Sequence, residues 1–213
     1  MTNFNETDNN KINVDITSIH ENERSVENQN SIAIDIPNET EERNIDKKKK
    51  EKEHVNFFKQ FLLPRVYITA IISFVVIIIF NIVSGIILEH VFHVTTNSNE
   101  EGLNEMQEIN PTFTIIYVCI IGPIIEELIF RRLIFWLIKK FSVVLAYLVS
   151  SFLFAFGHFG FSFSTLISEI YFFPVYFIMG VIFAYTYNYD GYILASMLSH
   201  ILNNTAVTLL SSL

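Results

Sequence analysis

Two carboxylates stand side by side within an apolar run, at Glu126 and Glu127. A charged side chain is costly in hydrocarbon, so ionisable residues in such a run indicate a functional site. On a helix, Glu127 and Arg131 are four residues apart and share a face, which predicts an ion pair. Glu126 projects about 100° away from that face, so we expect it to hold and deprotonate a water molecule. Pro123, about one turn earlier, predicts a kink that admits this water.

Two later apolar segments each carry a histidine four positions from a second notable residue. On helices, Phe154 lies over His158, and His200 lies over Asn204. A histidine in a membrane helix is often only a hydrogen-bonded packing residue, and that interpretation stands beside a catalytic one. With an acidic pair on a third helix, His158 and Glu126 can together activate water. His200 and Asn204 can then supply two hydrogen-bond donors to a developing oxyanion.

The elements that must position these groups follow from the composition. The chain has 213 residues, of which 51% are hydrophobic, and a formal net charge of −8. Residues 1–56 are almost all polar and predict a disordered cytoplasmic tail, whereas residues 57–213 predict a membrane-embedded domain. The acidic residues gather in solvated segments, which argues against nucleic-acid binding. The single cysteine, Cys119, lies in an apolar run and is expected only to pack.

The apolar segments predict an all-α, polytopic membrane bundle of about five transmembrane helices, since about 20 apolar residues cross a bilayer. The predicted spans are residues 66–88, 113–138, 142–161, 171–187 and 192–210. The lysines at 47–50 and 52 precede the first span and place the N-terminus in the cytoplasm. Residues 90–112 contain no Lys or Arg and predict an outward-facing loop. Alternation of the spans then places the C-terminus outside.

With these boundaries, the candidate catalytic residues lie at different depths in the membrane. At 1.5 Å per residue from the predicted cytoplasmic ends, His200 lies about 12 Å deep, Glu126 about 18 Å and His158 about 24 Å. Catalytic partners must meet at hydrogen-bond distance. We therefore expect tilted or broken spans, with breaks at Pro123, Gly157 or Gly160, or boundaries displaced by several residues.

The motifs Glu126-Glu127-x-x-x-Arg131, Phe154-x-x-x-His158 and His200-x-x-x-Asn204, in this order, resemble those of the CPBP family. That family comprises type II CAAX prenyl endopeptidases and bacteriocin-processing or immunity proteins, and the resemblance covers roughly residues 111–213. It implies an intramembrane glutamic endopeptidase of the bacterial plasma membrane. In it Glu126 and His158 act on water, while His200 and Asn204 stabilise the transition state. Family members often have Gly after the motif arginine, whereas Arg132 stands here.

A zinc-dependent protease is an alternative, because Glu126, His158 and His200 are a two-histidine, one-carboxylate set. The chain has no His-Glu-x-x-His run, and the resemblance implies metal-independent chemistry. We therefore expect no cofactor, and chelation discriminates between the two hypotheses.

A non-enzymatic bacteriocin immunity or membrane-binding protein is a second alternative, in which the same polar residues hold the helices together. The expected partners are membrane lipids and a membrane-associated protein or peptide substrate. A prenylated CAAX protein, a peptide pheromone and a bacteriocin precursor all remain open as substrates, as does the oligomeric state.

Overall fold

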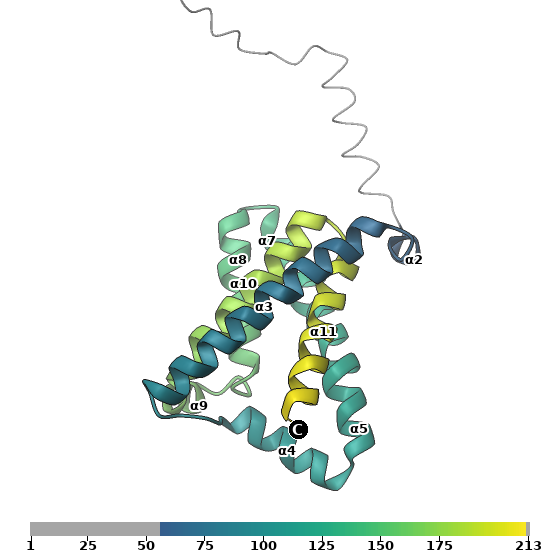
Figure 1. Cartoon of the computed structure of the whole chain (residues 1–213). Coiled ribbons are helices and arrows are strands. Elements are labelled where there is room, and N and C mark those ends of the chain that lie inside the picture. Colours follow the sequence, from purple (N-terminus) through teal and green to yellow (C-terminus); the bar gives the residue numbers. More distant parts are fainter. Residues whose placement is uncertain (1–55, 212–213) are drawn as a thin grey trace, which may run out of the picture. The chain divides into compact units, whose positions relative to one another are not determined.

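The structure, a computed structural model, describes residues 56–211 (Figure 1). This range contains helices and connecting turns but no strand, so the predicted all-α bundle is confirmed. The helices are α2 (Phe57–Gln60), α3 (Pro64–His90), α4 (Ser98–Ile109), α5 (Pro111–Ile116), η2 (Tyr117–Ile121), α6 (Gly122–Glu127), η3 (Leu128–Phe135), α7 (Trp136–Lys139), α8 (Val143–Gly157), α9 (Phe163–Ser168), η4 (Ile170–Phe172), α10 (Phe173–Asp190) and α11 (Ile193–Ser211). The predicted tail and its lysine run, up to residue 55, lie outside the described residues.

Four helical segments are long and apolar enough to cross a membrane: Pro64–His90, Pro111–Lys139, Ile170–Asp190 and Ile193–Leu210. The predicted span at 142–161 is wrong in length, because α8 has only 15 residues and ends at Gly157. Gly160 (φ 59°) and Phe161 (φ 55°) then take left-handed backbone angles that turn the chain. The bundle therefore has four candidate spans and one shorter apolar helix.

The segment at 90–112, predicted as an outward-facing loop, connects two candidate spans and contains the helix α4. The Asn97 side-chain oxygen accepts hydrogen bonds from the backbone N–H groups of Asn99 and Glu100, both at 3.1 Å. An N-cap of this kind supplies acceptors that the first helical turn lacks. Glu100 and Glu101 lie in that turn, where the helix dipole favours negative charge.

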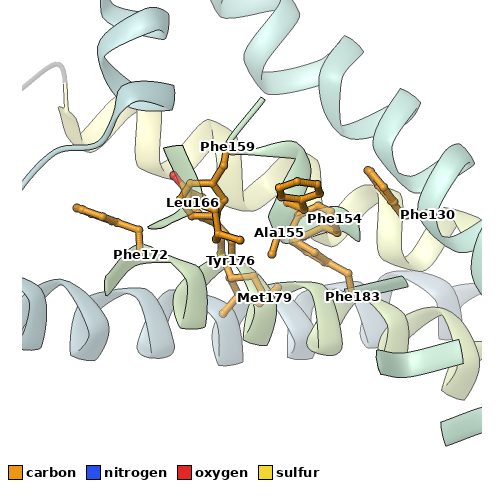
Figure 2. Packing of buried hydrophobic residues seen from close by; sticks show 11 residues of the cluster. Phe130, Phe154, Ala155, Phe159, Leu166, Phe172, Tyr176, Met179 and Phe183 are labelled. Atoms are coloured by element: carbon orange, nitrogen blue, oxygen red, sulfur yellow. The ribbon is translucent and has the colours of Figure 1, made fainter. Parts of the chain in front are cut away.

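Helices distant in sequence pack side by side in the bundle. α3 contacts both α10 and α11, and α8 contacts α10 (Figure 1). At Gly180 on α10 a β-carbon would lie only 3.0 Å from Ser151 Cα, so the small residue permits the close approach of α8. Phe154, Phe183 and Tyr176 belong to the apolar core at this contact (Figure 2). Rings of this core contact Arg131, His158 and His200.

Candidate active site

The helix that carries the two glutamates is π-helical on both sides of them. In η2 the Gly122 N–H bonds to the carbonyl of Tyr117, five residues earlier. The next donor in this register would be the nitrogen of Pro123, which has no hydrogen. Val118 O, the acceptor left without that donor, instead accepts from Asn204 Nδ2 at 3.0 Å. The irregularity predicted beside Pro123 is therefore a π-helical turn held by α11, and such turns frequently occur at functional sites.

The predicted ion pair of Glu127 with Arg131 is confirmed, with 3.3 Å between Oε1 and Nη1 and both side chains fully buried. Arg131 Nη2 also donates to the carbonyl oxygen of Gly180 at 2.9 Å. Its guanidinium lies over the ring of Phe154, 4.4 Å from the centroid. Arg132, the departure from the family pattern, is exposed and outside this cluster.

Glu127 also holds His200, a link that the helical spacing did not predict. His200 Nδ1 lies 3.2 Å from Glu127 Oε1, and an ionised carboxylate only accepts, so Nδ1 carries the hydrogen. The imidazole stacks on Phe183, with 4.3 Å between centroids. These contacts leave Nε2 facing Glu126, whose Oε2 lies 3.8 Å away. Glu127 therefore orients one ring and neutralises one arginine.

Glu126 differs from its neighbour in both exposure and partners. Its side chain is 32% exposed, whereas that of Glu127 is fully buried. Glu126 Oε2 is itself buried and has no hydrogen-bond partner within the described residues. A buried carboxylate oxygen of this kind normally bonds to water or another donor. The two adjacent acids are thus separated into a paired one and an available one.

His158 follows the last residue of α8 and is held by two contacts. Its Nδ1 lies 2.9 Å from the carbonyl oxygen of Phe154, which only accepts, so Nδ1 carries the hydrogen and a neutral ring has its lone pair on Nε2. The ring stacks on Tyr176 at 4.2 Å between centroids. The ring of Phe154 contacts both histidines, with its centroid 4.8 Å from that of His158 and 5.8 Å from that of His200. The structure thus groups residues that the depth estimate had separated.

Asn204 joins this group from α11, and its amide is partly committed. Nδ2 has two hydrogens, and the bond to Val118 O uses one of them. The other remains for an oxygen that enters the site.

Comparison with known proteins shows what the sequence around these residues is similar to. The family model for Rce1-like proteins, described as type II CAAX prenyl endopeptidase Rce1-like, matches residues 108–206. These residues form an Rce1-like domain. The match contains Glu126, His158, His200 and Asn204. Together with the four candidate spans, it makes the chain an integral membrane protein.

Two curated relatives are similar to this chain. The chain is 31% identical to the membrane-embedded CAAX protease MroQ of Staphylococcus aureus (strain USA300) over 71% of its own length and 59% of that protein. It is 32% identical to the UPF0177 protein YvdC of Lactococcus lactis subsp. lactis (strain IL1403) over 41% of its length and 34% of that protein. The chain therefore covers less than two thirds of either relative. No solved structure matches it.

The zinc alternative requires three ligands at one point. Among residues 56–211, no group of three His, Cys, Asp or Glu side chains is arranged to hold a metal ion. Nδ1 of His158 bonds to a carbonyl and Nδ1 of His200 bonds to a carboxylate. These bonds leave Nε2 of both rings open, so they do not decide between the zinc-dependent and the metal-independent hypotheses, which chelation distinguishes.

Sequence reasoning missed four residues that support the site. The carbonyl of Gly180 accepts from Arg131, and the rings of Phe183 and Tyr176 cover the two histidines. Asn203 bonds to Asn204. None of the four stands out in an apolar sequence, except that a second asparagine beside Asn204 is unusual in a membrane helix.

Proposed function

We propose that this chain is an intramembrane endopeptidase that hydrolyses a peptide bond of a membrane-associated polypeptide. The observation that carries this proposal is the division of the two acids: Glu127 is fully buried between Arg131 and His200, while Glu126 is 32% exposed and has no arginine or lysine ion-pair partner within the described residues. A partly exposed carboxylate beside a buried ion pair can be reached by water and substrate. We therefore assign Glu126 to the water molecule.

The reaction needs one water molecule and no further reactant. Glu126, with His158, removes a proton from water as its oxygen forms a bond to the scissile carbonyl carbon. The tetrahedral oxyanion then collapses, the carbon–nitrogen bond breaks, and the proton passes to the leaving amine. The lone pair on His158 Nε2 is suited to share this proton.

The position of His200 favours it as an oxyanion donor. This role requires a hydrogen on Nε2 as well as on Nδ1. Nδ1 already carries a hydrogen toward Glu127, and Nε2 faces Glu126. A protonated Nε2 and the second hydrogen on Asn204 Nδ2 are then two donors for the oxyanion.

The substrate class follows from the setting and the relatives. The acids lie on a segment long and apolar enough to span a membrane, so the scissile bond must reach them from the bilayer or its surface. The relative from Staphylococcus aureus is named a CAAX protease, which supports a peptide substrate. A prenylated CAAX protein, a pheromone and a bacteriocin precursor are the candidates.

The test compares membrane peptides from a deletion strain complemented with wild type, Glu126→Gln or Glu105→Gln. Glu105 is an exposed glutamate of α4 and provides a matched control. A peptide product should appear with wild type and Glu105→Gln, and Glu126→Gln should lower its rate of formation by roughly a hundredfold or more. Protein amounts must be equal in all three strains. Full function of Glu126→Gln would reject the hydrolase and favour the immunity or binding protein.

A further inference from the structure

Three side-chain amides form a chain from α3 to the π-helical turn before Glu126. Asn81 Nδ2 on α3 donates to Asn203 Oδ1 on α11 at 2.9 Å. Asn203 Nδ2 donates to Asn204 Oδ1 at 3.1 Å, and Asn204 Nδ2 donates to Val118 O at 3.0 Å. Asn203, the middle member, is only 4% exposed. The bonds at the middle of the chain are therefore made away from bulk solvent.

The direction of this amide chain is fixed at its last acceptor. Val118 O is a carbonyl, so the Asn204 atom that faces it must be Nδ2. Asn204 Oδ1 then needs a donor, which makes Nδ2 the atom of Asn203 that faces it. By the same reasoning, Asn203 Oδ1 needs the donor that Asn81 supplies. A lone asparagine amide has two flipped orientations of similar shape. The hydrogen bonds among the three amides select one of these orientations for Asn204.

We propose that Asn81 and Asn203 are positioning residues that hold the Asn204 amide in its donating orientation. This inference rests on the proposed function. When Asn204 Nδ2 faces the helix that carries Glu126, one of its hydrogens bonds to Val118 O and the other bonds to the substrate oxyanion. A flipped amide would present Oδ1 there, and two negative oxygens would then repel each other.

A simpler role for Asn81 and Asn203 is helix packing, since polar contacts commonly join membrane helices. The two roles differ in one consequence. If Asn203 acts only through the Asn204 amide, its removal has no further effect once that amide is absent. A packing contact would keep its effect in either background.

The first test measures hydrogen exchange of the Asn204 side-chain amide by NMR, with 15N-labelled asparagine in the full chain in lipid nanodiscs. The signal is assigned by its loss in Asn204→Ala. Asn203→Ala should speed this exchange about fivefold or more, and Asn81→Ala should speed it by a smaller factor. Asn188→Ala, the same truncation where Asn188 bonds to Tyr147, should leave it unchanged. Wild-type exchange of Asn204 in Asn203→Ala would overturn the proposal.

The second test measures cleavage of a farnesylated CAAX peptide and of the product-forming peptide found in the strain comparison. Asn203→Ala should lower kcat about tenfold without changing KM, which is less than the hundredfold expected for removal of an oxyanion donor. Its effect should vanish in an Asn204→Ala background, and additive losses would overturn the proposal. A failure of the proposed function gives a different result from a failure of this inference. Glu126→Gln would then retain wild-type cleavage, while exchange of the Asn204 amide would still respond to Asn203→Ala.

Discussion

Replacement of Arg131 by methionine tests the buried charge cluster most directly. Arg131 is fully buried, lies 3.3 Å from Glu127 and donates to the Gly180 carbonyl at 2.9 Å. Removal of one member of a buried ion pair leaves the other charge without compensation and costs about 3–5 kcal/mol. We expect Arg131→Met to lower the free energy of unfolding by that amount. The folding equilibrium then shifts by roughly a hundredfold to a few thousandfold.

A double-mutant cycle separates charge from size. Glu127→Gln keeps the shape of the side chain and an acceptor for His200, but removes the charge that Arg131 pairs with. If the ion pair dominates, Glu127→Gln together with Arg131→Met costs about 2–3 kcal/mol less than the sum of the single changes.

The assay for this cycle is unfolding of the purified full chain in mixed micelles of dodecylmaltoside and SDS, followed by circular dichroism. Arg132→Met is the matched control, because Arg132 is exposed and the chemical change is the same. It should alter the free energy of unfolding by less than about 0.5 kcal/mol. Additive losses in the double variant, or an Arg131→Met protein as stable as Arg132→Met, would refute the assigned pairing.

Three further predictions concern the backbone, the membrane orientation and the metal. Pro123→Ala restores a backbone donor for Val118 O in the π-helical register, so it should raise the free energy of unfolding by about 1–3 kcal/mol. The new N–H would compete with Asn204 Nδ2 for Val118 O, so cleavage should fall at least tenfold; unchanged cleavage would contradict this role of the turn. In a Cys119→Ser background, a membrane-impermeant maleimide should label Glu101→Cys in intact cells, because residues 90–112 are predicted to face outside. It should label Lys139→Cys only after lysis, and the reverse labelling pattern would contradict the predicted topology. 1,10-phenanthroline should leave the cleavage rate unchanged, whereas a loss restored by added zinc would refute the metal-free mechanism.

Local patterns predicted the parts of this protein that depend on short distances along the chain. The ion pair of Glu127 with Arg131 follows from a four-residue helical spacing, and the structure confirms it. The apolar runs predicted α3, α10 and α11 because a bilayer fixes the length of a spanning helix. The disordered tail and the catalytic roles stay predictions.

Contacts between helices were harder to predict because they depend on tertiary geometry. Nothing in the spacing of Glu127 indicates that it faces His200, 73 residues later. The predicted α8 boundary was also wrong, because apolar residues continue the hydrophobic run to Phe161, whereas the helix ends at Gly157.

The pairing of Glu127 with Arg131 within one turn has a consequence for biogenesis. Both residues leave the ribosome almost together, so the two charges can pair while the segment is still in the translocon. His200, in contrast, is synthesised 73 residues later and reaches Glu127 only when α11 arrives. The bilayer can therefore accept the helix that carries the two glutamates with this ion pair already formed, and the candidate active site is completed by the last helix described.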